Sequence, residues 1–365
     1  MTQEKNKTSL SVERLDWLDA TRGLAIIAVI AYHVDLGMVL SNIPTPEYLH
    51  RWLAAADLVR MPLLVFLAGL AIRISRGSDR PGFVRGRALK LAYPFLIWAV
   101  AYTAVWHLLP TERNSRELLD VLLAPIWPNS HLWFLQALLL YTLTIPVLAR
   151  ISVLAGLALA AAVSLSVGFS GEQLKDEASL QLFAPHRALY VWFAAGYLSS
   201  LPVRTWVAST GWQLRAGLGL AGLTAVALLG PALAHLRYLP QSAPVAALGI
   251  AAVVLTVSCI RRGWRMHAFL AVFGVYSLEI YVLHIGVLSV LRQTLNRMAA
   301  LEGGPLYLSC LVLATALSLA AAVLVQKTPA RLLFSNPFLA ARGGPGAGGR
   351  RLITGRSRLG LALFG

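Results

Sequence analysis

An arginine and a histidine stand in helical register in the first long apolar segment of the chain. Arg22 opens the segment and His33 follows eleven residues later (RGLAIIAVIAYH). At 3.6 residues per turn, eleven residues return to nearly the same helix face, displaced by roughly 16 Å along the axis. One stripe then carries a guanidinium at its start and an imidazole deep in the apolar segment. This layout suits a long anionic ligand whose reactive end reaches the imidazole.

His33 has a functional and a structural explanation, and the acidic residues near it are not expected to be its partners within this helix. An ionisable side chain inside an apolar span is costly and by default marks a functional site. The alternative is a structural hydrogen bond to a neighbouring helix. Asp35 lies two residues on and faces elsewhere, so no direct pair with His33 is expected within this helix. Asp19 and Arg22 are three residues apart, which favours an ion pair over a catalytic role for Asp19.

A second polar stripe occurs late in the chain, in the segment VYSLEIYVLHIGVL. Ser277, Tyr281 and His284 are spaced by four and three residues and therefore share one helix face. Glu279 points at another angle, where an unpaired carboxylate is costly in an apolar segment. The stripe is suited to lining an aqueous cavity, and equally to hydrogen bonding between helices.

Two further pairs of residues lie at the ends of apolar segments. Arg85 and Arg87 precede one segment, where a planar guanidinium can donate paired hydrogen bonds to phosphate. The alternative explanation is the general excess of basic residues in loops on one side of a membrane. His131 and Trp133 begin another segment and are suited to holding a sugar or to anchoring the helix at the membrane interface, which is the favoured interpretation for Trp133.

The composition indicates that these apolar segments span a membrane. The chain has 365 residues, of which 57% are hydrophobic and 13% charged, whereas a soluble domain has roughly 25% charged residues. Single apolar segments of about 20 residues must satisfy their own backbone hydrogen bonds in lipid, so they form helices. The sequence therefore predicts an all-α, polytopic transmembrane bundle of about ten helices. The predicted spans are 23–40, 59–74, 91–109, 132–149, 151–168, 184–200, 214–234, 241–260, 267–290 and 305–325.

The basic residues determine the expected orientation. Most of the 32 Lys and Arg residues fall in alternate loops, which places both termini in the cytoplasm. The net charge of +16 therefore reflects topology and not a nucleic-acid partner. We expect a cytoplasmic segment at 1–13, a membrane domain at 14–338 and a disordered basic, Gly-rich tail at 339–365 that can contact anionic lipid. Cys259 and Cys310 have no metal-type spacing, so neither a zinc site nor a disulfide framework is expected.

Several segments together resemble the acyltransferase-3 family of membrane O-acyltransferases. The resemblance rests on their joint order and spacing over residues 14–338. The segments are RLDWLDATRG (14–23) with His33, MPLLVFLAG (61–69), RGR (85–87) before Tyr93 and Pro94, HLWFL (131–135) and YSLEIYVLH (276–284). One departure is Ala68, where a serine before Gly69 is common in the family.

The resemblance implies a bundle of ten or so helices that transfers an acyl group, usually acetyl, from cytoplasmic acyl-CoA to extracytoplasmic sugars. The implied acceptor is an exopolysaccharide, an O-antigen or a related cell-surface glycan, or a lipid-linked oligosaccharide, and the implied location is the cell (inner) membrane among its lipids. Arg22 and His33 correspond to the family's essential pair, and Arg85 and Arg87 to its cytoplasmic arginine motif. Acetyl-CoA is implied as a co-substrate, with no bound metal or cofactor.

These correspondences suggest a role for each candidate residue. His33 acts either as general base on the acceptor hydroxyl or as a covalent nucleophile that takes the acyl group first. The residues expected to hold the donor phosphates are Arg22, Arg85 and Arg87. The candidates for orienting the base or stabilising the oxyanion are Glu279, Tyr281 and His284. The acceptor is expected near His131, Trp133, Ser277 and Tyr281.

Two other classes of membrane protein stand as alternatives. A transporter or flippase for polysaccharide intermediates moves its substrate without consuming acetyl-CoA. Such proteins often contain inverted repeats, and the sequence shows no such symmetry. A structural subunit of a polysaccharide assembly complex has no need of Arg22 and His33 in register, so it would tolerate loss of His33.

Overall fold

The chain folds into a bundle of helices. The computed structural model describes residues 16–75, 81–108, 123, 126, 131–170, 183–236, 239–299 and 303–335. Within these ranges all regular secondary structure is helical, which confirms the predicted all-α class. The predicted segments 1–13 and 339–365 lie outside the described residues, as do both termini. Their cytoplasmic location therefore stays a prediction.

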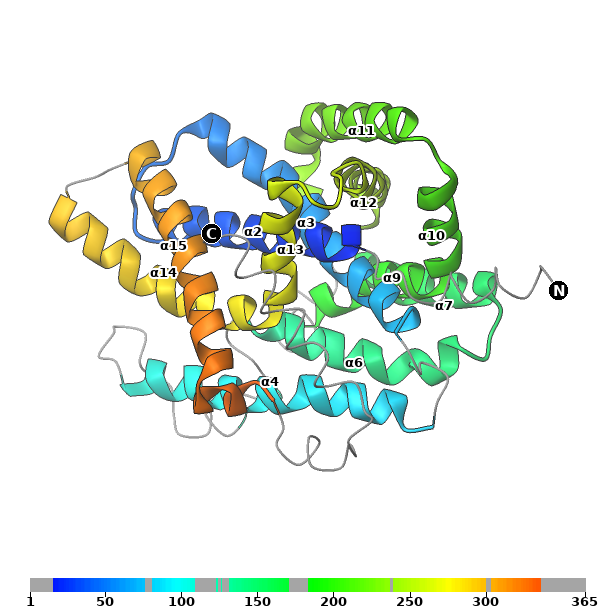
Figure 1. Ribbon diagram of the computed structural model, residues 1–365, viewed down its shortest axis with the longest axis horizontal. Coiled ribbons are helices and arrows are strands. Elements are labelled where there is room, and N and C mark those ends of the chain that lie inside the picture. Colours follow the sequence, from blue (N-terminus) through cyan, green and yellow to red (C-terminus); the bar gives the residue numbers. More distant parts are fainter. Residues whose placement is uncertain are drawn as a thin grey trace.

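Twelve α-helices and three short 3₁₀ helices form the described part of the chain. The α-helices are α2 (Asp16–Val39), α3 (Glu47–Arg73), α4 (Phe83–Leu108), α6 (Trp133–Leu148), α7 (Val153–Ser170), α9 (Ala184–Leu198), α10 (Ser200–Ser209), α11 (Trp212–Leu233), α12 (Ala243–Ser258), α13 (Arg265–Val275), α14 (Ser277–Ala299) and α15 (Gly303–Lys327). The 3₁₀ helices are η1 (Ala234–Leu236), η2 (Pro240–Ser242) and η3 (Pro329–Leu333). Figure 1 shows α2, α3 and α13 in the middle of the bundle, with α4 along one side and α11 along the opposite side.

Several helices in the described ranges are long and apolar enough to cross a membrane. By length and composition these are α2, α3, α4, α11 and α15, and the bent pair of α13 and α14 counts as a sixth. The helices α6, α7 and α12 are apolar but shorter. The architecture is consistent with a polytopic helical membrane protein, and the count of about ten spans stays a prediction.

The helix α3 is longer than the span predicted at 59–74. It begins at Glu47, so Arg60 lies in the middle of a helix and not near its start. The predicted boundary was wrong because an apolar window stops at the charged residues Asp57 and Arg60. These two form an ion pair inside the protein, where both are almost fully buried. The stretch between the predicted spans 184–200 and 214–234 also contains a helix, α10.

The span predicted at 267–290 is not one helix. The helix α13 ends at Val275 and α14 begins at Ser277, with a bend of 80° between them. A single apolar run in the sequence carries no signal for such a break, because both halves are helical and apolar. The predicted segment is therefore a bent pair of helices and not one continuous helix, and the bend changes where the second polar stripe points.

Two glycines fix the direction of α13 by letting its backbone touch that of α2. A Cβ atom added at Gly274 would lie 1.8 Å from the carbonyl oxygen of Asp19, and one added at Gly23 would lie 1.8 Å from that of Leu270. Small residues allow such close approach between helices in membranes, where packing drives association. The contact holds α13 against the start of α2, and the bend then directs α14 toward the later part of α2.

Candidate active site

Three histidines from distant parts of the chain meet in the interior. His33 lies in α2, His284 in α14 and His131 two residues before α6. The ring centroids of His33 and His284 are 4.9 Å apart, and those of His284 and His131 are 5.2 Å apart. His284 is fully buried, whereas His33 and His131 are half-buried. We call these three residues the histidine cluster; it unites side chains that the sequence placed in separate candidate roles.

Hydrogen bonds to backbone carbonyls assign the tautomers of two of these rings. The Nδ1 atom of His284 lies 2.6 Å from the carbonyl oxygen of Tyr281, and a carbonyl only accepts, so Nδ1–H is the donor. The lone pair on Nε2 of His284 then faces Nδ1 of His33 at 3.3 Å. Nδ1 of His33 also lies 2.9 Å from the carbonyl oxygen of Val29 and donates there. Nε2 of His33 is consequently the basic nitrogen of this half-buried ring.

His131 is held against α14 from two directions. The Tyr281 hydroxyl donates a hydrogen bond to the His131 carbonyl oxygen. The His131 ring donates from Nε2 to the carbonyl oxygen of Val282 at 3.2 Å. The Tyr102 hydroxyl of α4 donates to the same carbonyl at 2.7 Å, and its ring lies 5.0 Å from that of His131. Sequence analysis missed Tyr102, because nothing in its own segment distinguishes it from other interfacial tyrosines.

Other predicted site residues point away from the histidine cluster. The Glu279 carboxylate is buried and accepts a hydrogen bond from Gln326 of α15. Trp133 packs against Phe134 and against His186 of α9. Ser277 begins α14, and no hydrogen bond among the described residues joins its hydroxyl to the cluster. Of the predicted polar stripe, only Tyr281 and His284 therefore lie at the site, and Ser277 does not.

Asp35 is paired outside the cluster. Its carboxylate accepts hydrogen bonds from Nδ1 of His50 at 3.0 Å and from the Thr45 hydroxyl at 3.2 Å. Asp35 is buried, whereas the His50 side chain is 57% exposed. These contacts confirm that Asp35 faces away from His33, as the spacing of two residues predicts.

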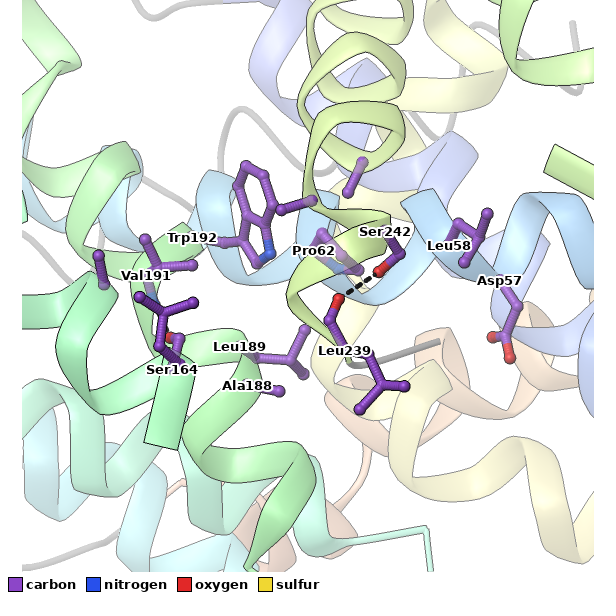
Figure 2. Close-up of a pocket in the computed structure, with 14 residues that line it drawn as sticks. Asp57, Leu58, Pro62, Ser164, Ala188, Leu189, Val191, Trp192, Leu239 and Ser242 are labelled. Atoms are coloured by element: carbon purple, nitrogen blue, oxygen red, sulfur yellow. Dashed lines mark hydrogen bonds between the residues drawn. The ribbon is translucent and has the colours of Figure 1, made fainter. Parts of the chain in front are cut away.

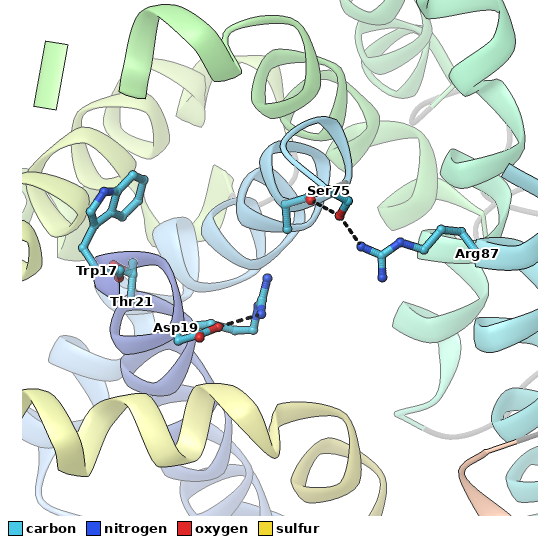
Figure 3. Close-up of polar contacts among 7 residues, drawn as sticks. Trp17, Asp19, Thr21, Ser75 and Arg87 are labelled. Atoms are coloured by element: carbon cyan, nitrogen blue, oxygen red, sulfur yellow. Dashed lines mark hydrogen bonds and ion pairs between the residues drawn. The ribbon is translucent and has the colours of Figure 1, made fainter. Parts of the chain in front are cut away.

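Two cations, Arg22 at the start of α2 and Arg87 of α4, form what we call the cationic end. Arg22 forms the expected ion pair with Asp19, with an Nη1–Oδ1 distance of 3.4 Å. Figure 3 shows Arg87 reaching from α4 to Ser75 at the end of α3, with Asp19 nearby; its Nη2 donates to the Ser75 hydroxyl at 2.8 Å. The charges of Arg87 and Arg22 are close enough to repel each other.

The two arginines of the Arg-Gly-Arg step are not equivalent. Arg87 is half-buried and directed into the protein, whereas Arg85 is exposed. A Cβ atom added at Gly86, between them, would have no described atom within 4 Å. Only Arg87 therefore joins Arg22 at the cationic end.

A buried ion pair on α3 is the largest feature that sequence analysis missed. Arg60 is 6% exposed and Asp57 is 3% exposed. The Arg60 guanidinium lies 3.9 Å from the ring centroid of Tyr32, the residue before His33. Its charge interacts electrostatically with both His33 and His284. The sequence signal for this ion pair was two opposite charges three residues apart: Arg60 lies in VRMPLL (59–64), and Asp57 lies just before that segment.

Comparison with known proteins shows the family of the chain. A family model described as an acyltransferase domain matches residues 15–325, which include the histidine cluster, the cationic end and the buried ion pair. The chain belongs to the acyltransferase-3 family. No curated protein and no solved structure matches it.

For a membrane acyltransferase, the histidine cluster offers a basic nitrogen that is held in place. Within the described ranges no group of three His, Cys, Asp or Glu side chains has the arrangement of a metal site. In the histidine cluster each ring donates a hydrogen bond to a backbone carbonyl. Acyl transfer needs a base that removes a proton from the attacking group, and Nε2 of His33 fits that requirement.

A cavity of about 170 Å³ lies beside α3. Its lining comes from α3, α7, α9, η2 and α12, and it is mostly apolar. Figure 2 shows Asp57, Leu58 and Pro62 along one side, and Trp192 and Ser164 on the other. None of the three histidines lines this cavity, whereas Asp57 of the buried ion pair does.

Proposed function

We propose that this membrane acyltransferase transfers an acetyl group from cytoplasmic acetyl-CoA to a hydroxyl of an extracytoplasmic sugar, in a cell-surface glycan such as an exopolysaccharide or an O-antigen. One observation carries the proposal. The helix α2 runs unbroken from Asp16 to Val39, with Arg22 in its second turn and His33 eleven residues on. The rise of an α-helix puts the two residues roughly 16 Å apart along the axis.

The cationic end is proposed to bind the phosphates of the donor. Arg22 and Arg87 are close together and come from different helices, and guanidinium groups match phosphate geometry. Asp19 pairs with Arg22, and the Ser75 hydroxyl accepts a hydrogen bond from Arg87. Arg85 is exposed nearby on α4 and contributes at most a peripheral contact. The pantetheine arm then follows α2 and presents the thioester to His33.

His33 is proposed to act as the general base. Its Nε2 takes the proton of the acceptor hydroxyl as that oxygen attacks the thioester carbonyl. The imidazolium that forms keeps its Nδ1–H between the Val29 carbonyl oxygen and Nε2 of His284. His284 thus orients His33, and its own Nδ1–H is fixed by the Tyr281 carbonyl oxygen. A covalent acyl-histidine at the same Nε2 is the alternative route.

The acceptor sugar is proposed to approach beside His131. This ring is half-buried, and its Nε2 is committed to the Val282 carbonyl oxygen, which leaves Nδ1 to accept a hydrogen bond. Tyr281 positions the His131 backbone, and Tyr102 supports it from α4. The acceptor thus approaches from the His131 side and the donor from the cationic end. The inner membrane of a bacterial-type cell is the location that suits such transfer.

The proposal is tested by the O-acetyl content of cell-surface polysaccharides. We would compare the wild type, a deletion strain and a strain expressing His33→Ala at matched membrane levels. Loss of one acetyl ester in both altered strains would support the proposal and identify the acceptor. Loss in the deletion strain alone would leave acyl transfer in place and contradict the role of His33. If no ester changes in either strain, the proposed glycan acceptor is wrong.

A further inference from the structure

The buried ion pair of Asp57 and Arg60 lies next to the proposed site and has no part in the proposed function. Both side chains are almost fully removed from solvent, with exposures of 4% for Asp57 and 5% for Arg60. Ionisable residues inside a membrane domain are costly and mark function by default. An arginine that served only packing would be replaceable by an apolar residue, together with its acid.

The guanidinium of Arg60 lies over the ring of Tyr32, which in turn contacts His33. It lies 3.9 Å from the ring centroid of Tyr32, and the Tyr32 and His33 rings are 5.1 Å apart in an edge-to-face contact. Its charge interacts with both His33 and His284. The Nε atom of Arg60 is buried and has no hydrogen-bond partner among the described residues. The side chain therefore keeps at least one N–H donor that no described group accepts from.

Acyl transfer creates a demand for such a donor. When the acceptor oxygen bonds to the acyl carbon, the π electrons of the carbonyl move onto its oxygen, and the acceptor proton passes to Nε2 of His33. Collapse returns those electrons, breaks the bond to the leaving group and lets the leaving group take the proton. Preorganised donors aimed at the transient oxyanion lower this barrier. The Nδ1–H groups of His33 and His284 do not supply them, because both donate to backbone carbonyls.

We propose that Arg60 is the oxyanion-stabilising catalytic residue of this acyltransferase, and that Asp57 holds it in place between turnovers. The inference rests on His33 as the base of the proposed function. A guanidinium stays charged in an apolar site and offers several donors in one plane. Asp57 neutralises it while the acyl carbonyl is uncharged, and the oxyanion then shares its hydrogen bonds during the reaction.

A purely structural ion pair is the competing explanation, and paired substitutions separate the two. Arg60→Met alone leaves Asp57 as an uncompensated buried charge, so its effect on folding masks its effect on catalysis. The double variant Asp57→Asn with Arg60→Met removes both charges and keeps similar volumes. Arg51→Met is the matched control, because Arg51 pairs with Glu47 on the same helix but at the exposed surface.

The experiment measures turnover and folding for these variants in inverted membrane vesicles that retain their endogenous acceptor. Release of CoA thiol from acetyl-CoA gives kcat and KM, and the apparent Tm of the purified proteins reports folding. We expect the double variant to recover the wild-type Tm but to lose about 10²–10³-fold in kcat, the usual effect of removing an oxyanion donor, with KM for acetyl-CoA unchanged. Arg51→Met should match the wild type in both.

Wild-type kcat in the double variant would overturn the proposal and leave the pair structural. The assignment of acetyl-CoA as the donor is tested separately. Thiol release is compared between wild-type and His33→Ala vesicles, because release by this enzyme must depend on His33. If it does not, the acetyl-CoA assignment fails, and the O-acyl ester content of the same strains still decides the role of Arg60 for whichever donor is used. Ester content equal to that of wild type in the double variant would then reject Arg60.

Discussion

The cationic end and the histidine cluster are built in opposite ways. Arg22 keeps 25% of its side chain exposed, and its described ion pair is a long one to a neighbour on the same helix. In the cluster His284 is fully buried, and the imidazole N–H groups are bonded to backbone carbonyls. A phosphate-binding region must exchange its own contacts for those of a ligand, whereas a base must be fixed before the substrate arrives. The difference predicts separable effects on binding and on turnover.

The largest effect is expected from removing the basic nitrogen. His33→Ala should lower kcat by about 10²–10⁴-fold, the usual contribution of a general base. The dissociation constant of acetyl-CoA should stay within about twofold, because the cationic end is roughly 16 Å away along α2. Calorimetric binding and thiol-release assays on one preparation measure both quantities. Weaker binding with normal kcat would show that the two regions do not divide binding from chemistry.

The next effect concerns the crossing that directs α14 to the cluster. Gly274→Ala places a Cβ atom 1.8 Å from the Asp19 carbonyl oxygen, which is backbone and cannot move aside. We expect it to destabilise the protein by about 1–3 kcal/mol through overpacking and to reduce turnover by displacing His284. Gly217→Ala is the matched control, because its Cβ would have no described atom within 4 Å.

The unfolding of the purified proteins, followed by tryptophan fluorescence, measures this difference. The control in α11 should be neutral or slightly stabilising, since alanine favours helix over glycine by roughly 0.5–1 kcal/mol. Equal stability of Gly274→Ala and Gly217→Ala would mean that the α13–α2 contact is looser than described. The bend at Tyr276 would then need another explanation.

The two arginines of the Arg-Gly-Arg step should differ in donor affinity. Arg87→Ala should weaken acetyl-CoA binding by about 10–100-fold, the loss expected for a charged hydrogen bond. Arg85→Ala should weaken it by less than about fivefold, because exposed charges contribute little. Titration of each purified variant with acetyl-CoA gives the two dissociation constants to be compared. Similar losses at both positions would place Arg85 in the donor site on equal terms.

Much of the cationic end was predictable because it depends on short-range spacing. The Asp19–Arg22 pair follows from three residues on one helix, and the register of Arg22 and His33 follows from the helical period. The contact between His131 and His284 could not be predicted from the sequence, because it depends on a bend at Tyr276 that an apolar run does not encode. Arg60 was not among the predicted site residues, because a hydropathy window counts Asp57 and Arg60 as two interruptions and does not reveal that they pair.

The smallest effect tests how tightly the cluster is held. Tyr102→Phe removes the hydrogen bond from α4 to the Val282 carbonyl oxygen, which still accepts from His131. A single neutral hydrogen bond contributes about 0.5–1.5 kcal/mol, so turnover should fall by about two- to tenfold, with donor affinity unchanged. Tyr141→Phe removes a similar bond to the His186 carbonyl oxygen outside the cluster, and it should lower stability without lowering turnover. If both variants lower only stability, Tyr102 supports the fold, and the ordered part of the site ends at α14.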